Sequence, residues 1–327
     1  MKNKENDMGA IQERIAEVAG YQAKRTARED FDEFWSRTLD RFASKPLNGR
    51  RERAETMMQG ITAEHVTFEG FDDTPLHGWF LVPNGSGEKK KHPCLVIYQG
   101  YQCHRGLPEN YAAWLLMGYA VFAVDTRGQT GETGNRLTSG QGIVKGWMTQ
   151  GILEPEQFYA KAMTIDAWKA LEWVKEQPEI DPQRIGVYGT SQGGGLALQM
   201  AALSDVPRAA VANVPNLCHL EFALMNSTGS VAEIAEFLAR NPGELERVLT
   251  TLSYFDNLNL AEKINIPVLY SAGFKDMICW PETIAAAYNR NPAPGKELLL
   301  YPFMGHEEGP DEHRLKVYAF LREQLQR

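Results

Sequence analysis

Short apolar runs recur along most of the chain and predict the strands of a sheet. Residues 64–68 alternate between polar and apolar side chains, and residues 76–82 follow a turn at Asp72 and Asp73, so these segments predict a pair of antiparallel strands. Further along the chain the apolar runs are mostly unbroken, which is typical of strands covered on both faces. They predict buried strands at residues 94–98, 119–124, 184–188, 209–214, 267–271 and 296–301.

Segments with helical periodicity separate these runs. Residues 155–177 carry apolar side chains at three- or four-residue spacing, which predicts a long helix with a buried face. Residues 109–117 and 196–203 predict shorter helices. Because helices and strands alternate along the chain, the pattern predicts an α/β fold in which a mostly parallel sheet has helices on both faces.

Two further segments have helical patterns but do not fit a simple alternation. Residues 8–43 are rich in Glu, Arg and Ala with apolar side chains spaced for helix faces, and we assign residues 1–60 to an N-terminal helical extension. Residues 217–260 lie between two predicted strands and are too many for a simple crossover. They contain helix-like pieces and predict a helical cap inserted over the site.

Composition and charge fit one domain and exclude some partners. With 327 residues, 43% of them hydrophobic, the chain can bury a single large core, so residues 1–327 are predicted to form one α/β domain with helical additions. The formal net charge is -8, and acidic and basic residues are mixed throughout. Since the sequence has no basic stripe that could bind a phosphate backbone, nucleic acid is not an expected partner.

Neither a membrane nor a metal is predicted as a partner. No run approaches the roughly 20 apolar residues of a spanning helix. The start of the chain is polar and has no apolar core of a secretory signal, which predicts a cytoplasmic protein. The cysteines are far apart and form no C-x-x-C pattern, so they predict buried thiols and neither a disulfide framework nor a zinc site. They are Cys94, Cys103, Cys218 and Cys279.

A candidate nucleophile lies between a predicted strand and a predicted helix. Residues 189–193 read Gly-Thr-Ser-Gln-Gly and match the G-x-S-x-G pattern of a nucleophile elbow, with Ser191 at its centre. Such a tight turn leaves space for small residues only, and Gly189, Gly193, Gly194 and Gly195 provide it. The alternatives are a chance glycine-rich helix entry and a phosphate loop. The strand-turn-helix setting favours the elbow.

A serine hydroxyl needs a base and an acid that orients the base. In this type of site the chain order is serine, acid, histidine. Asp276 follows the predicted strand at residues 267–271, and His306 follows the strand at residues 296–301, so we select these two. The alternatives Asp125 and Asp256 have less suitable positions. So do the other histidines, which are expected to be surface or packing residues: His65, His77, His92, His104, His219 and His313.

An acyl-transfer site also needs backbone N–H donors for the developing oxyanion. They usually come from the residue after the nucleophile and from the loop after the third strand. Gln192 and Tyr101 occupy these places. The alternative for the loop around Tyr101 is an ordinary glycine-containing turn.

Three motifs occur together in this chain: Arg127-Gly-Gln129 after a strand, the Gly-Thr-Ser-Gln-Gly elbow, and His306-Glu307. With these motifs the chain resembles the seventh carbohydrate-esterase family, the acetyl xylan esterase and cephalosporin C deacetylase group, over nearly its whole length. The resemblance implies that Ser191, Asp276 and His306 form a triad with Tyr101 and Gln192 as oxyanion donors, while Arg127 and Gln129 organise loops.

The same resemblance implies a function and an assembly. It implies removal of acetyl groups from xylo-oligosaccharides and small esters such as cephalosporin C, without a cofactor, by a homo-oligomer that is a hexamer. This chain departs from the family pattern at residues 130–134 and at Cys103-His104, which lie on predicted rim loops. Two other hypotheses stay open, a serine peptidase of the same fold and a catalytically silent binding protein with a hydrolase fold.

Overall fold

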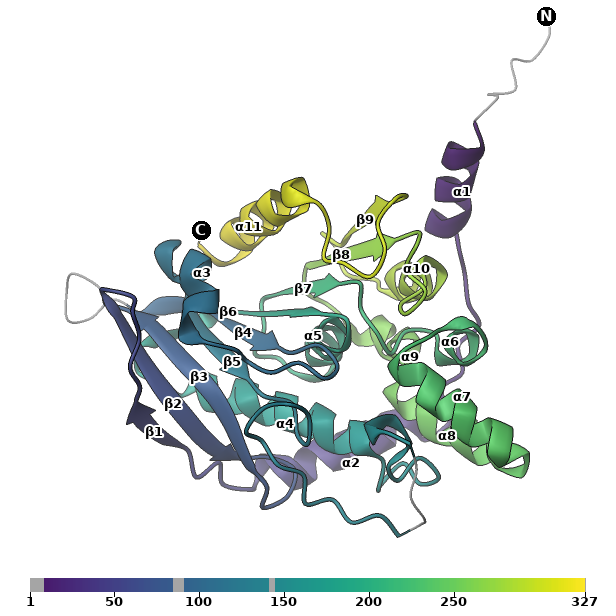
Figure 1. Cartoon of the computed structure of the whole chain (residues 1–327), viewed down its shortest axis with the longest axis horizontal. Coiled ribbons are helices and arrows are strands. Elements are labelled where there is room, and N and C mark those ends of the chain that lie inside the picture. The colour runs from purple at the N-terminus through teal and green to yellow at the C-terminus, as the bar shows by residue number, and fades with distance from the viewer. Residues whose placement is uncertain (1–8, 85–90, 141–144, 327) are drawn as a thin grey trace, which may run out of the picture.

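The computed structural model describes residues 9–84, 91–140 and 145–326. The cytoplasmic prediction rests on the polar first residues of the chain, and most of them lie outside these ranges. A sheet of nine strands runs through the described chain in the order β1-β2-β3-β5-β4-β6-β7-β8-β9 (Figure 1). Its strands are β1 (Arg50–Arg53), β2 (Ile61–Glu69), β3 (Pro75–Pro83), β4 (His92–Tyr98), β5 (Ala120–Val124), β6 (Ile180–Thr190), β7 (Ala209–Asn213), β8 (Val268–Gly273) and β9 (Glu297–Tyr301).

The sheet combines an antiparallel edge with a parallel centre. β2 pairs antiparallel with β3 over its whole length, and β3 is antiparallel to β5. From β5 to β9 all neighbouring strands are parallel. Each predicted strand is present with ends that shift by a few residues, and the predicted mostly parallel α/β fold is confirmed. The expected burial is wrong for β9, which lies at the edge of the sheet and is exposed at Glu297 and half-buried over its other residues.

The structure contains an edge strand, β1, that the sequence analysis did not predict. Its sequence, Arg-Arg-Glu-Arg, has no apolar position, so hydrophobic alternation could not reveal it. It is held by backbone pairing with β2 and by Arg51, which donates to Glu64 at 2.7 Å and to Glu179 at 2.6 Å. Charged side chains on an edge strand also oppose pairing with another chain.

Helices cover both faces of the sheet (Figure 1). On one face, α3 packs against β3 and β5 and α11 packs against β6 and β7, where they bury Trp114, Leu115 and Leu321. On the other, α4, α5 and α10 pack over the larger core, which includes Phe122 and Ile165. The bounds are α3 (Ala112–Leu116), α4 (Tyr159–Lys175), α5 (Gln192–Leu203), α10 (Pro281–Arg290) and α11 (Asp311–Leu325), with short 3-10 turns η1 (Pro108–Tyr111) and η2 (Trp147–Thr149).

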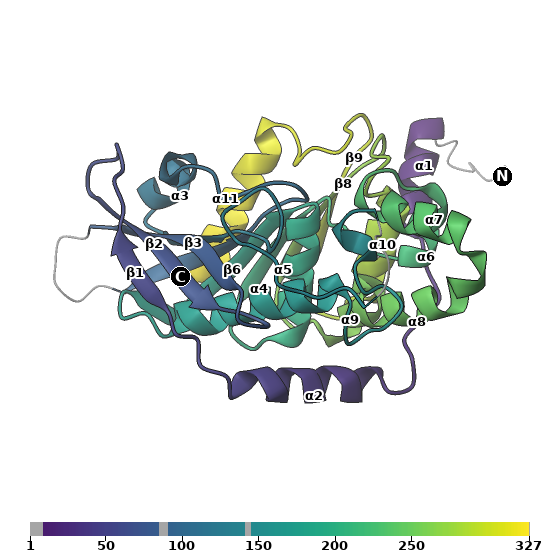
Figure 2. The same ribbon diagram turned by 60° about the horizontal axis from the view of Figure 1, so that its bottom comes forward.

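The N-terminal helix α2 packs against the segment between β7 and β8, whereas α1 packs against α10. α2 lies outside α4 in Figure 2, and its Trp35 stacks edge-on against Phe255 and donates its indole N–H to the Tyr254 carbonyl at 2.9 Å. No described helix is long and apolar enough to cross a membrane. The helices are α1 (Ala10–Ala19), α2 (Phe31–Ala43), α6 (Leu220–Asn226), α7 (Ser230–Arg240), η3 (Pro242–Glu244), α8 (Leu245–Phe255), α9 (Asn257–Leu260) and η4 (Ala261–Lys263).

The parallel strands deliver the predicted site residues to one edge of the sheet. The loops that follow the carboxyl ends of β4, β6, β8 and β9 carry Tyr101, Ser191, Asp276 and His306, respectively. The carboxyl edge of a parallel sheet is where α/β proteins place their ligand sites. Residues far apart in the sequence can therefore meet here.

Candidate active site

Ser191 occupies a strained turn between β6 and α5. Its φ of 59° and ψ of -119° lie outside the regions that side chains ordinarily adopt. The turn is tight, because a Cβ atom on Gly189 would lie 2.2 Å from the Gly193 carbonyl carbon, and one on Gly193 would lie 2.1 Å from the Tyr98 oxygen. The prediction that these glycines provide space is confirmed. The turn presents Ser191 at the end of the sheet.

A chain of hydrogen bonds joins the three predicted triad residues. Ser191 Oγ lies 2.9 Å from His306 Nε2, and His306 Nδ1 lies 2.8 Å from Asp276 Oδ2. The other oxygen of the buried Asp276 accepts the backbone N–H groups of Ile278 at 2.8 Å and Cys279 at 2.9 Å. These contacts leave Oδ2 for the imidazole. The arrangement can therefore take a proton from Ser191 and stabilise the imidazolium that forms.

The alternative acids have structural partners elsewhere. Asp256 is buried and accepts the backbone N–H groups of His219, Leu220 and Leu258 at 2.7–2.8 Å. Burial raises the pKa of Asp256 to about 7. Asp125 forms a buried ion pair with Arg105. Neither carboxylate contacts the imidazole of His306.

The alternative base His313 is a packing residue at the start of α11. Its Nε2 lies 2.8 Å from Asn213 Oδ1, and its Nδ1 lies 3.0 Å from the Tyr301 hydroxyl. Burial lowers the pKa of His313, so the ring is neutral under ordinary conditions. Both ring nitrogens have partners, and neither partner is Ser191.

Ser191 and His306 line a pocket of ≈ 730 Å³. Its walls come from the loop after β4, from α3 and α11, and from the start of α7 at Ser230. This volume is typical of small-molecule sites. Cys103 and His104 lie on its wall.

Of the two predicted oxyanion donors, Gln192 follows the serine in the chain, and Tyr101 lines the same pocket as Ser191. Gln192 is the first residue of α5, where backbone N–H groups have no partner within the helix. Tyr101 lies in a turn whose next residue, Gln102, has a φ of 58°. Gln129 fixes the geometry between them, since its Oε1 accepts the Gln102 N–H at 2.7 Å and its Nε2 donates to Gln192 Oε1 at 2.8 Å.

Arg127 anchors the segment that carries Gln129. The fully buried guanidinium donates to both oxygens of Asp166, at 2.5 and 2.9 Å, and to Asp72 at 3.2 Å. The Tyr159 hydroxyl donates to the Arg127 carbonyl at 2.6 Å and accepts from Gln129 Nε2 at 3.0 Å. The Arg127-Gly-Gln129 motif thus makes the contacts expected of a loop organiser.

A family model of acetyl xylan esterases (AXE1) matches residues 8–324. The chain belongs to this family. Members are carboxylic ester hydrolases, and two solved members share the whole fold. The acetyl xylan esterase from Paenibacillus sp. R4 has a TM-score of 0.91 and 37% identity and covers 95% of this chain and 99% of its own. Acetyl xylan esterase 1 from Thermoanaerobacterium sp. JW/SL YS485 has a TM-score of 0.87 and 28% identity, with 94% and 98% covered.

One curated relative is a longer protein than this chain. The acetyl esterase Axe7A of Xylanibacter ruminicola is 25% identical over 288 residues, which are 85% of this chain and 63% of that protein. The chain thus spans about 63% of the length of this relative.

The segment between β7 and β8 contributes a residue that no sequence pattern indicated. Glu233 on α7 accepts the Tyr101 hydroxyl at 2.6 Å and the Met148 N–H at 3.3 Å. Trp147 packs edge-on against the Tyr101 ring at 5.5 Å. Burial and the Glu233 carboxylate raise the pKa of Tyr101, so its hydroxyl stays protonated and donates. In the sequence Glu233 looks like any acid on an amphipathic helix.

We expect Gln129→Ala to lower kcat by about 10²-fold with little change in KM. The substitution removes the acceptor that holds the loop of Tyr101, and losing one oxyanion donor costs about 10²- to 10³-fold elsewhere. Steady-state hydrolysis of p-nitrophenyl acetate measures both constants. Gln150→Ala is the matched control, because the Gln150 side chain lies in the same region but bonds Asn135 and the Leu137 carbonyl. Equal losses in both variants would mean that the loop is merely loosened.

Proposed function

We propose that this family member is a serine esterase that removes acetyl groups through an acyl-enzyme on Ser191. The observation that carries the proposal is the chain of contacts from Ser191 through His306 to Asp276, with distances of 2.9 and 2.8 Å, on the wall of a pocket. The family match supports the same reaction class.

In the first step, Ser191 Oγ attacks the acetyl carbonyl while His306 Nε2 takes its proton. Negative charge then develops on the carbonyl oxygen, where the backbone N–H groups of Gln192 and Tyr101 are the proposed donors. His306 returns the proton to the departing sugar hydroxyl as the C–O bond breaks. The products are a free alcohol and acetylated Ser191.

In the second step, a water molecule replaces the alcohol. His306 takes a proton from the water, whose oxygen attacks the acetyl carbonyl of the acyl-enzyme. Collapse of the second tetrahedral intermediate breaks the bond to Ser191 Oγ, which regains a proton from His306. Acetate leaves, and every step uses residues of this chain alone.

The proposed substrates are short acetylated xylo-oligosaccharides and small esters such as cephalosporin C. A pocket of ≈ 730 Å³ suits a small ester, and α7 borders it at Ser230. The proposed assembly is a homo-hexamer with its sites facing inward, which rests on the family resemblance. A closed assembly would restrict entry by size.

We expect faster acetate release from acetylated xylo-oligosaccharides than from intact acetylated xylan at equal acetyl concentration, by about tenfold or more. Light scattering on the same sample gives the mass of the assembly. A monomer that deacetylates polymer and oligomers equally fast would contradict the proposed size selection and leave the proposed triad untouched.

Two comparison assays separate the alternative functions. Labelling of Ser191 by a fluorophosphonate distinguishes an active serine hydrolase from a silent binding protein. Peptide amides presented beside acetyl esters distinguish a peptidase, because an esterase cleaves only the latter at a measurable rate. No labelling in the folded wild type would overturn the proposal.

A further inference from the structure

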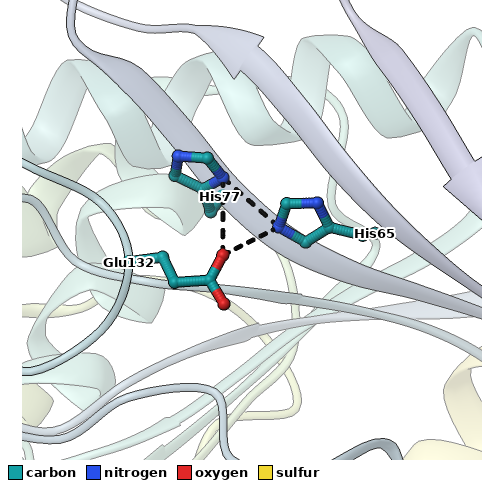
Figure 3. Close-up of side chains that lie close together, drawn as sticks. All are labelled: His65, His77 and Glu132. Atoms are coloured by element: carbon teal, nitrogen blue, oxygen red, sulfur yellow. Dashed lines mark hydrogen bonds and ion pairs between the residues drawn. The ribbon is translucent and has the colours of Figure 1, made fainter. Parts of the chain in front are cut away.

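Two histidines and a glutamate meet on the outer part of the antiparallel edge, away from the triad. His65 lies on β2 and His77 on β3, and their rings stack at 5.1 Å with an interplanar angle of 16°. Glu132 reaches them from the loop that follows Gln129. Figure 3 shows the two rings and the carboxylate converging on one point.

The three converging atoms have the spacing of metal ligands. His65 Nε2 and His77 Nδ1 are 3.3 Å apart, and Glu132 Oε2 lies 3.1 Å from the first and 3.8 Å from the second. Ligands at 2.0–2.1 Å from a tetrahedral zinc ion are about 3.3–3.4 Å apart. Small side-chain adjustments would therefore place all three around one ion.

Hydrogen bonds alone do not give all three of these atoms a well-placed partner. If His65 Nε2 carries the proton and donates to Glu132, an unprotonated His77 Nδ1 can only share that proton or accept from the Thr67 hydroxyl. If His77 donates to His65 instead, an unprotonated nitrogen faces the Glu132 oxygen. The Thr67 hydroxyl is 3.5 Å from His77 Nδ1, at the long limit of a hydrogen bond. A cation would accept a lone pair from each of the three atoms.

The surrounding charges favour a cation. Arg105 donates to the other Glu132 oxygen at 3.0 Å, which leaves Oε2 for the imidazoles and orients the carboxylate. The charge of Arg105 is opposed by the fully buried Asp125. Arg105 carries one positive charge, and Asp125 and Glu132 each carry one negative charge, so the cluster with neutral imidazoles has a net negative charge.

We propose that His65, His77 and Glu132 form a binding site for a divalent transition-metal cation of the zinc class. Two imidazoles and one carboxylate are ligands that zinc accepts, and three protein ligands leave one position for water. The Glu132 side chain is 61% exposed, and those of His65 and His77 are 23% and 21% exposed, so an ion can enter from solvent.

A bound ion would connect the antiparallel edge to the active-site loops. Glu132 belongs to the segment 130–134, which departs from the family pattern, and it contacts Arg105 of the loop that follows β4. Arg105 and Tyr101 belong to the same loop, and both line the pocket. The ion would hold this loop to β2 and β3 and would take no part in ester chemistry.

Binding of Zn²⁺ and Co²⁺ to the full chain, stripped with EDTA, tests the proposal. We expect one equivalent of Zn²⁺ to bind at micromolar concentration, to raise Tm by about 2 °C or more, and to be displaced by EDTA. Bound Co²⁺ should show tetrahedral absorption without a thiolate charge-transfer band. That band identifies the alternative group of Asp276, Cys279 and His306, which belongs to the candidate active site.

Substitutions locate the ion. His65→Gln and His77→Gln should each weaken Zn²⁺ binding by about tenfold or more, and Glu132→Gln, on an exposed loop, provides a variant that does not disturb a strand. His92→Gln on β4 is the matched control and should bind like wild type. Absence of Zn²⁺ binding below millimolar concentration, unchanged binding in all three ligand variants, or a thiolate band in the Co²⁺ spectrum would each overturn the proposal.

Discussion

Ser191→Ala is expected to lower kcat for acetyl ester hydrolysis by about 10⁵- to 10⁶-fold, as loss of the nucleophile does in other serine hydrolases. The smaller side chain fits the tight elbow, so the protein should stay folded. The strained φ of 59° is set by the turn and persists in the variant. Acetate release and thermal unfolding, measured on the same preparation, separate activity from stability.

Controls for this prediction come from the same helix and from the same proton path. Ser204→Ala, at the carboxyl end of α5, should keep wild-type activity because the Ser204 hydroxyl accepts the Val206 N–H and lies away from the triad. His306→Ala should lose about as much as Ser191→Ala, and the double variant should lose little more, since the two residues act as a unit. Residual turnover of Ser191→Ala within about tenfold of wild type would remove Ser191 from the mechanism.

Asp276→Asn is expected to lower kcat by about 10⁴-fold with little change in KM. The amide nitrogen would face His306 Nδ1 in place of a carboxylate oxygen and favour the wrong imidazole tautomer. Ile278 and Cys279 donate their N–H groups to the other oxygen, and they fix which side of the side chain faces the ring. A pH profile of kcat should change together with its magnitude, because the base itself is perturbed.

Asp256→Asn is the matched control for the acid. The two carboxylate oxygens of Asp256 accept three backbone N–H groups. An amide nitrogen in place of either oxygen would leave a buried N–H donor unsatisfied, at a cost of about 1–3 kcal/mol. We therefore expect a lower Tm and an unchanged kcat in the folded protein. The reverse result, a loss of kcat in Asp256→Asn and none in Asp276→Asn, would show that the acid is misplaced.

The sequence by itself determined the features that depend on local pattern. Polar–apolar alternation and a turn predicted β2 and β3, and apolar runs predicted the strands from β4 to β9, because strands covered by helices on both faces carry mostly apolar side chains. The elbow was predictable because few residue types fit a turn in which Gly189 and Gly193 nearly touch their neighbours. Chain order and strand ends then indicated Asp276 and His306, since parallel strands bring their carboxyl ends to one edge.

Only the tertiary structure decided which polar side chains meet. β1 has no apolar pattern, the Glu233 contact to Tyr101 joins segments separated by 132 residues, and the cluster of His65, His77 and Glu132 joins two strands to a distant loop. Polar side chains carry no periodic signal, because their partners are set by strand register and by the path of loops in space. A buried face constrains a whole segment, whereas a single hydrogen bond or ligand contact constrains two atoms.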